Sequence, residues 1–176
     1  MHSEKPSSIA AGIISFHPDI SRLKENLLSV RDQVSAIYLF DNGSPEPDTI
    51  RKLCTELSRP DCPIRFIPSE TNQGIAFGLN RFFEHAMEDG HSWVLTLDQD
   101  SICYPTLIEM YVPYMAEAAS LTSLRKDRNM EEESGEDGSA EETERCITSG
   151  NLVSIDAWKA ISGFNERLFI DMVDVD

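Results

Sequence analysis

The segment SIAAGIISFHPDI (residues 8–20) joins an apolar run to the start of a helix. Residues 8–16 are rich in isoleucine and end at His17-Pro18, which is typical of a buried strand. Asp19 then stands where a helix N-cap belongs. The segment therefore predicts a strand followed at once by a helix. The residues that follow at helical spacing are Ile20, Leu23, Leu27, Leu28 and Arg31.

The same alternation of strand and helix continues along the chain. Alternating strands and helices predict an α/β fold with a mostly parallel central sheet flanked by helices. Ligands of such sheets bind at the carboxyl ends of the strands. Further strands are expected at 36–40, 63–68, 92–98 and 146–155, and helices at 49–58, within 72–90, from Pro105 to about Glu117, and from Asp156 to Gly163. The inner residues of the 72–90 helix are expected to be Leu79, Phe82, Phe83 and Met87, with Gly90 as its stop.

Length and composition limit the class of protein. The chain has 176 residues, of which 40% are hydrophobic, and this suits one domain with its own core. No apolar run approaches the roughly 18 residues that a membrane span needs. The opening residues, MHSEKPSS, do not resemble a secretory signal. We therefore expect a single cytoplasmic domain over 1–176, and we exclude transmembrane, secreted and collagen-like classes.

The negative charge is unevenly distributed. The formal net charge is −16, and residues 131–144 hold eight acidic groups and no basic one. Such a stretch repels itself, so we expect residues 120–145 to form a flexible acidic insert. The chain shows no basic stripe of the kind that binds a phosphate backbone, which argues against a nucleic-acid partner.

The four cysteines, Cys54, Cys62, Cys103 and Cys146, show no CxxC spacing. We expect reduced thiols without a chemical role rather than a zinc site or disulfides.

Two carboxylates, Asp98 and Asp100, follow the predicted strand 92–98 with one residue between them. This spacing allows both to bind one Mg²⁺ or Mn²⁺ ion, which prefers one or two carboxylates together with substrate phosphate oxygens. The alternative is that Asp98 caps the next turn and Asp100 is solvated.

Asp41 follows the apolar strand 36–40 and precedes a glycine turn. Its carboxylate could accept a hydrogen bond from the N3–H of uracil or thymine. The alternative is an Asx-turn, which Asp-Asn-Gly favours.

Asn72-Gln73-Gly74 forms a small-residue turn before a helix, where free backbone N–H groups could meet phosphate. The alternative is an N-cap at Asn72, with Gly74 easing the packing of strand and helix. The pattern is not a dinucleotide-binding fingerprint.

The tail FIDMVDVD (169–176) places Asp171 and Asp174 on one face if it is helical. Carboxylates among apolar neighbours have a raised pKa, which suits a general base. The alternative is the start of an ordinary amphipathic helix.

Six segments in this order resemble the inverting glycosyltransferases of family 2, and within them the bacterial rhamnosyltransferase branch. The segments are SFHPD (15–19), LFDNGS (39–44), NQGIAFGLN (72–80), WVLTLDQDS (93–101), TSGNLVS (148–154) and GFNERLFIDMVDVD (163–176). The resemblance implies a GT-A fold, with one nucleotide-sugar-binding α/β domain. It also implies a role for each of the matching positions.

By this resemblance Asp98 and Asp100 hold Mg²⁺ or Mn²⁺ on the diphosphate, and Asp174 is the general base that deprotonates the acceptor hydroxyl. Phe16 lies against the nucleobase of the donor, and Asp41 contacts that pyrimidine. The donor-nucleotide residues are Ser15, Phe16, Asp41, Asn72, Gly74 and Asp98, and those on the sugar and acceptor side are Gly150, Asn151 and Asp171.

The implied reaction is an inverting transfer from a dTDP- or UDP-linked sugar, foremost dTDP-L-rhamnose, to a saccharide or lipid-linked saccharide in surface polysaccharide or O-antigen synthesis. Relatives continue beyond the position of Asp176, so we expect a C-terminally truncated piece. Peripheral contact with the inner face of the plasma membrane is expected only through segments beyond Asp176. A non-catalytic nucleotide-sugar-binding domain and a nucleotidyltransferase are the alternatives.

Overall fold

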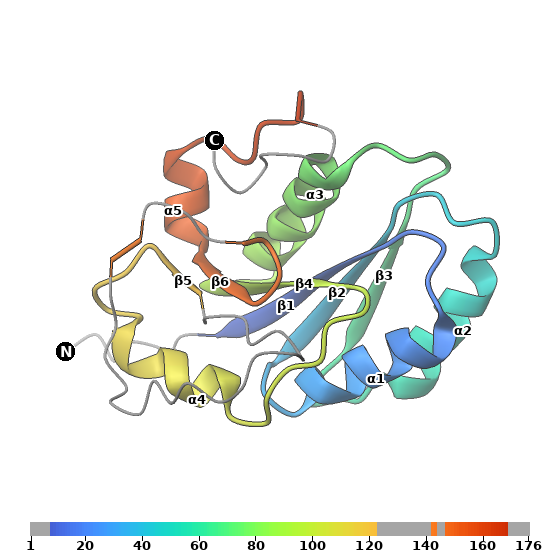
Figure 1. Ribbon diagram of the computed structural model, residues 1–176, viewed down its shortest axis with the longest axis horizontal. Coiled ribbons are helices and arrows are strands. Elements are labelled where there is room, and N and C mark those ends of the chain that lie inside the picture. The colour runs from blue at the N-terminus through green and yellow to red at the C-terminus, as the bar shows by residue number, and fades with distance from the viewer. Residues whose placement is uncertain (1–7, 123–141, 144–146, 169–176) are drawn as a thin grey trace, which may run out of the picture.

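The computed structural model of the chain describes residues 8–122, 142–143 and 147–168, and within them the strands form one mixed sheet (Figure 1). The strand order is β3-β2-β1-β4-β6-β5. Neighbours among β1 to β4 pair in parallel, whereas β6 pairs antiparallel with both β4 and β5. The mostly parallel sheet that the sequence predicts is confirmed. The strands are β1 (Ile9–Ser15), β2 (Ala36–Asp41), β3 (Ile64–Pro68), β4 (Trp93–Asp98), β5 (Ser120–Thr122) and β6 (Asn151–Ser154).

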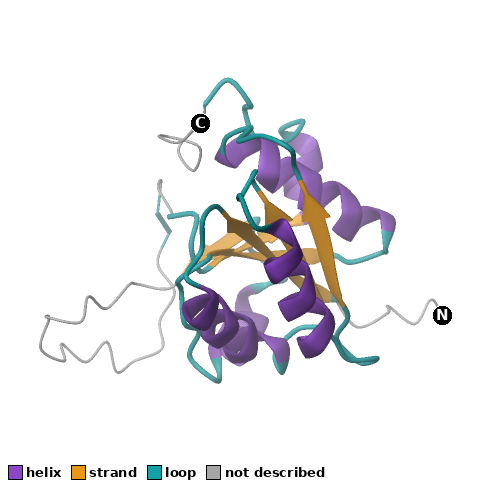
Figure 2. Cartoon of the chain, turned by 90° about the vertical axis from the view of Figure 1, so that its right-hand side faces the viewer, coloured by secondary structure: helices purple, strands orange, loops and turns teal. Residues whose placement is uncertain are grey.

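Helices cover both faces of the sheet, which gives three layers (Figures 1 and 2). One face carries α1 (Ile20–Arg31), α2 (Pro47–Leu57) and α4 (Leu107–Tyr111), and the other carries α3 (Ile75–Glu88) and α5 (Ile155–Ala160). Each face has its own apolar core. Leu23, Leu27 and Ile50 belong to the first, and the second includes a group of aromatic side chains, Phe82, Phe83 and Trp158.

The helix α1 begins as predicted, and its buried face includes one polar residue. The Asp19 side chain caps it by accepting a hydrogen bond from the Arg22 N–H at 2.8 Å. Leu28 is exposed, whereas Asn26 and Val30 are buried beside Leu23 and Leu27. The polar residue Asn26 thus lies on the inner face, whereas Leu28, one of the apolar residues at helical spacing, lies outside.

The inner face of α3 differs from prediction at one residue. Leu79, Phe82 and Phe83 are buried as expected, but Met87 is exposed and Ala86 lies inside instead. Gly90, with φ of +83°, follows the end of this helix.

The predicted helix from Pro105 to Glu117 is wrong in length. It is divided into α4 and a 3-10 turn, η1 (Val112–Tyr114). Pro113 lies in that turn, and because proline has no backbone N–H it cannot continue the hydrogen bonding of an α-helix.

The last predicted strand and helix also have different bounds. β6 begins at Asn151 rather than at residue 146, and the N-cap of α5 is Ser154 rather than Asp156. The Ser154 hydroxyl accepts from the Ala157 N–H at 3.5 Å, and the helix ends at Ala160.

Three residues of the predicted acidic insert belong to the sheet. Ser120–Thr122 form β5, the edge strand beside β6, so the expectation of a flexible insert from residue 120 is wrong at its start. Because β5 is short and carries no charge, the acidic composition that suggested an insert begins only after it. Residues 123–141 and 144–146 lie outside the described part.

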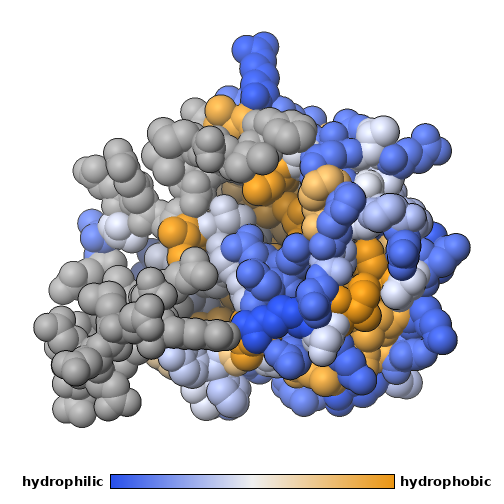
Figure 3. Space-filling model, turned by 45° about the vertical axis from the view of Figure 1, so that its right-hand side comes forward, coloured by the Kyte–Doolittle hydropathy of each residue, from blue (hydrophilic) through white to orange (hydrophobic). Residues whose placement is uncertain are grey.

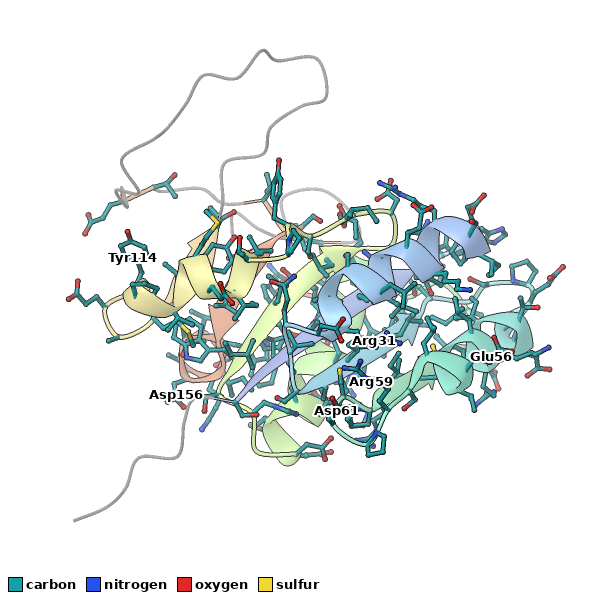
Figure 4. All side chains as sticks on the ribbon, turned by 90° about the horizontal axis from the view of Figure 1, so that it is seen from below. Arg31, Glu56, Arg59, Asp61, Tyr114 and Asp156 are labelled. Atoms are coloured by element: carbon teal, nitrogen blue, oxygen red, sulfur yellow. The ribbon has the colours of Figure 1, made fainter. Side chains whose placement is uncertain are left out.

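Charged side chains gather at the amino ends of β2 and β3, on the opposite edge from the strand carboxyl ends. Figure 4 labels Arg31, Arg59 and Asp61 there. Arg59 pairs with Asp32 at 2.8 Å and with Asp61 at 3.2 Å, so two carboxylates lie beside the positive charge of its guanidinium group.

The surface that Figure 3 shows carries separate apolar patches among polar side chains. Among the described residues, no helix is long and apolar enough to cross a membrane.

Candidate functional site

The register of the sheet places three predicted site residues side by side. Ser15 pairs with Asp41 across β1 and β2, and the neighbouring Ile14 pairs with Asp98 across β1 and β4. All three therefore lie at the carboxyl edge of the parallel strands, where α/β sheets bind ligands.

Asp41 is a buried carboxylate with one unsatisfied oxygen. Its side chain has no exposed area, and the Ser15 hydroxyl donates to Oδ1 at 3.3 Å. No described residue donates to Oδ2, which is buried as well. A buried carboxylate oxygen without a donor is costly, and an N–H group that reached Oδ2 would relieve that cost.

Phe16 follows β1 and is 43% exposed at the same edge. Its backbone is held by one amide side chain: the Phe16 N–H donates to Gln99 Oε1 at 2.8 Å, and Gln99 Nε2 donates to the Phe16 carbonyl at 3.3 Å. The next residue, His17, has φ of +49°, and its N–H donates to the Ser44 hydroxyl at 3.0 Å. The left-handed conformation is unfavourable for a residue other than glycine, so these contacts fix a strained turn.

The side chains of Asp98 and Asp100 are exposed, and α1 holds the backbone of their turn. Asn26 Nδ2 donates to the carbonyls of Asp98 and Ser101, at 2.9 and 2.6 Å. Arg22 Nε donates to the Asp100 carbonyl at 2.8 Å. The two carboxylates therefore project from a turn whose backbone is fixed.

These contacts belong to a polar row on α1 and just after it, formed by Arg22, Asn26, Ser29 and Gln33. Ser29 accepts from the Cys103 N–H at 3.0 Å, and Gln33 donates to the Tyr104 carbonyl at 2.9 Å. The apolar pattern of the sequence does not predict this row. Its signal in the sequence is a set of polar residues spaced by three or four positions, next to the apolar residues of the same helix.

The turns after β2 and β3 are joined through Asn42. Its Nδ2 donates to Asn72 Oδ1 at 2.9 Å, and its Oδ1 accepts from the Gln73 N–H at 2.8 Å. Asn72 Oδ1 also accepts from the Gly74 N–H at 2.9 Å. The N-cap of α3 is Gly74, with φ of +88°, so Asn72 shapes the turn rather than capping the helix. Asn42 is a further residue of this edge, and the sequence pattern alone does not assign it to the site.

Gly150 lies close to this edge, and Asn151 lies further inside the sheet. Next to Gly150, the Ser149 hydroxyl accepts from the Asp98 N–H at 3.2 Å, and the Gly150 N–H donates to the Thr96 carbonyl at 2.8 Å. Asn151 is buried opposite Thr96, and its side chain accepts from the Ser120 hydroxyl on β5. The structure therefore brings Gly150 to the site, whereas Asn151 joins two strands. Asp171 and Asp174 lie outside the described residues.

Asn80 attaches residues 163–166 to α3. In the sequence this segment precedes Asp174, the predicted general base. Asn80 Oδ1 accepts from the Trp158 indole and from the Phe164 N–H, at 3.1 and 2.8 Å. Its Nδ2 donates to the Phe164 carbonyl and to Glu166 Oε1, both at 2.9 Å. The buried amide is thus fully used, a role that sequence pattern alone did not assign.

The three described cysteines are buried. Burial raises the pKa of Cys54 to about 12 and that of Cys103 to about 11. It raises the pKa of Cys62 as well. These groups remain protonated thiols at neutral pH, which makes them poor nucleophiles.

A shallow hollow of about 600 Å³ lies on the outer side of the Asp98–Asp100 turn. None of the predicted site residues lines it. Its lining residues are Arg22, Glu25, Leu28, Ser29 and Ile102.

The sequence profile described as "Glycosyl transferase family 2" matches residues 13–168, which is most of the chain. The chain belongs to glycosyl transferase family 2.

A curated relative of this family 2 chain is the dTDP-rhamnosyl transferase RfbF of Shigella flexneri, which is 22% identical over 188 residues. The alignment covers 97% of this chain and 62% of RfbF, so the chain spans less than two thirds of that relative.

Solved glycosyltransferases share the fold. The mannosyltransferase PcManGT of Pyrobaculum calidifontis, solved in complex with GDP-Man and Mn²⁺, matches with a TM-score of 0.72 at 15% identity, over 93% of this chain and 49% of PcManGT. TarS of S. aureus matches with a TM-score of 0.68 at 16% identity, over 94% of this chain and 52% of that structure. The predicted GT-A fold is confirmed.

The two carboxylates of this family 2 chain fit a hard divalent cation. Asp98 and Asp100 offer oxygen ligands on an exposed turn of fixed backbone, and Mg²⁺ or Mn²⁺ completes such a set with substrate oxygens and water. Among the described residues, no cluster of three or more His, Cys, Asp or Glu forms a metal cage. The donor set therefore suits a cation that arrives with a phosphate ligand.

Proposed function

We propose that this chain is the donor-binding domain of an inverting glycosyltransferase that uses a pyrimidine nucleoside diphosphate sugar, foremost dTDP-L-rhamnose. The acceptor is a hydroxyl of a saccharide or lipid-linked saccharide, in surface polysaccharide synthesis. The similarity to a dTDP-rhamnosyl transferase supports the choice of donor. We propose that residues 1–176 form one nucleotide-sugar-binding domain.

The observation that carries the proposal is the unsatisfied Asp41 Oδ2, buried beside Ser15 at the carboxyl edge. The N3–H of uracil or thymine is a donor that such an oxygen can accept. The exposed ring of Phe16, which follows Ser15 in the chain, offers an apolar surface for the face of the base. Base recognition is thus assigned to the ends of β1 and β2.

The diphosphate is assigned to the turn that follows β4. Asp98 and Asp100 would hold Mg²⁺ or Mn²⁺, and the cation would neutralise the charge of the leaving diphosphate. The turn of Asn72 and Gly74 flanks the donor on its other side, because Asn42 holds it against the end of β2.

The transfer step is assigned to Asp174. Its carboxylate takes the proton of the acceptor hydroxyl while that oxygen attacks the anomeric carbon. The bond to the nucleoside diphosphate breaks and the configuration inverts. A positioned general base contributes about 10²- to 10⁴-fold to such a rate. Gly150 and Asp171 are assigned to the sugar and acceptor side, and Asn151 is not, because it is buried between β4 and β5.

The test is a calorimetric titration of the chain with dTDP, UDP and GDP, each with and without Mn²⁺. We expect dTDP and UDP to bind more tightly than GDP, and Mn²⁺ to strengthen their binding. The variant Asp41→Ala removes the carboxylate, and a hydrogen bond to a charged group is worth about 1.5–3 kcal/mol. It should weaken dTDP binding roughly 10- to 100-fold and reduce the preference over GDP.

Asp48→Ala is the matched control, because Asp48 is an exposed aspartate on α2 whose ion pair is with Arg51 alone among the described residues. It should bind nucleotides as the parent does. A preference for GDP would contradict the pyrimidine assignment, and absence of binding to all three nucleotides would contradict the donor-binding function of this chain.

A further inference from the structure

We propose that Gln99 is a positioning residue that fixes Phe16 relative to the Asp98–Asp100 turn, so that base and diphosphate are recognised as one rigid unit. This inference deepens the proposed function and rests on it. Gln99 is the residue between the two carboxylates, where the spacing of the pair places no requirement on the side chain.

The Gln99 side-chain amide makes two hydrogen bonds to one residue, Phe16. It accepts from the Phe16 N–H at 2.8 Å and donates to the Phe16 carbonyl at 3.3 Å, and so spans from the end of β4 to the end of β1. Both backbone groups of one residue are bonded by one side chain. This fixes the peptide planes on either side of Phe16, and with them the direction in which its side chain leaves the backbone.

Other hydrogen bonds hold both turns that the Gln99 side chain connects, the one after β4 and the one after β1. On the β4 side, Asn26 and Arg22 of the polar row on α1 bind the carbonyls of Asp98, Ser101 and Asp100. On the β1 side, the His17 N–H donates to the Ser44 hydroxyl at 3.0 Å. Gln99 therefore joins two fixed turns and is not a loose surface contact.

The backbone next to Phe16 is strained. His17 adopts φ of +49° although it is not glycine, and such backbone costs of order 1–3 kcal/mol when its surroundings enforce it. Phe16 itself is 43% exposed, and its ring meets the His17 ring edge-on at 4.3 Å rather than packing in a core. Without the Gln99 amide the turn relaxes, and the exposed ring loses its fixed direction.

The ligand-free test is hydrogen exchange at the Phe16 amide. Loss of a hydrogen bond worth about 1 kcal/mol should speed exchange of this amide roughly five- to tenfold in Gln99→Ala. Gln73→Ala is the matched control, because Gln73 is an exposed glutamine at the same edge whose side chain contacts the neighbouring Thr71 at 2.6 Å. Equal exchange at Phe16 in the parent and in Gln99→Ala would overturn the proposal.

The ligand test compares dTDP with inorganic pyrophosphate, both in the presence of Mn²⁺. Gln99→Ala should weaken dTDP binding roughly five- to tenfold and leave pyrophosphate binding within twofold, because pyrophosphate has no base to place on Phe16. Phe16→Leu should weaken dTDP binding too, and the double variant should be no weaker than the worse single one, since Gln99 acts through Phe16.

The outcomes separate the two proposals. If the parent binds no nucleotide, the proposed function fails and this inference fails with it, whatever the exchange rates. If the parent binds dTDP and Gln99→Ala binds it equally well, the inference alone is overturned. Equal losses for dTDP and pyrophosphate would make Gln99 a part of the metal turn and would also overturn the inference.

Discussion

At the scale of single residues, Gly12 decides how closely the sheet and α3 approach each other. Gly12 lies in the middle of β1, between β2 and β4. A Cβ atom there would lie 2.2 Å from Cε2 of the Phe82 ring. The ring therefore occupies the space that any larger residue needs, and the aromatic core of that face depends on a missing side chain.

We expect Gly12→Ala to destabilise the fold by about 1–3 kcal/mol, the usual cost of overpacking a closely packed core. Urea unfolding of the parent and the variant measures this change. Phe82→Leu in the same chain should make Gly12→Ala less damaging, because the smaller side chain relieves the clash. Additive losses in the double variant would contradict the assigned contact.

At the scale of elements, the sequence predicts the strand ends that carry the site better than the side-chain hydrogen bonds that join one element to another. Strand ends follow from apolar runs closed by polar turns, so the sequence predicts that Ser15, Asp41 and Asp98 lie at the carboxyl ends of strands. The strand order and the register that make them neighbours come from the structure alone. The Asn26 and Gln99 contacts were not, because a polar residue on a helix or turn has many candidate partners until the fold selects one. The alternatives left open at Asn72 needed the same three-dimensional information.

Asn80 shows how one helix can hold a distant segment. It lies on α3 and bonds to Trp158, Phe164 and Glu166, which follow it by 78 to 86 positions. Gly163, with φ of +86°, approaches it so closely that a Cβ there would lie 2.9 Å from Asn80 Oδ1. The position of residues 163–166 thus depends on one buried amide.

We expect Asn80→Asp to release this segment, because the carboxylate cannot donate to the Phe164 carbonyl and repels Glu166. Leaving such buried groups unpaired costs about 1–3 kcal/mol. Trypsin should then cleave after the exposed Arg167 several times faster than in the parent. Asn165→Asp adds the same charge in the same segment and should not speed cleavage. Equal rates in both variants would contradict the role of Asn80.

At the scale of the whole molecule, the two edges of the sheet carry different kinds of chemistry. The carboxyl edge presents exposed acids and an unsatisfied carboxylate, whereas the amino edge is closed by internal contacts. There the Ser8 hydroxyl bonds to His91 Nδ1 at 2.8 Å and to the Ser35 hydroxyl at 3.0 Å. His91 also meets the Tyr38 ring edge-on at 5.9 Å. His91 therefore links the segments that precede β1, β2 and β4.

This link predicts how the unfolding free energy depends on pH. Burial lowers the pKa of His91 below its ordinary value of 6.5, and the nearby Asp89 opposes this only in part. The unfolded chain therefore binds a proton more readily than the folded one. The contribution of neutral His91 is complete above pH 6.5 and is lost as the pH falls through the lowered folded pKa.

We expect the parent to lose stability relative to His91→Asn as the pH falls from about 7.5 to about 5, because asparagine keeps an amide near the Nδ1 position but does not titrate there. Urea unfolding at a series of pH values gives the difference between the two curves, in which shared carboxylate effects cancel. Above pH 7 the curves should run parallel. A constant difference across the whole range would show that His91 keeps its unfolded pKa in the fold, and would remove it as the source of acid sensitivity.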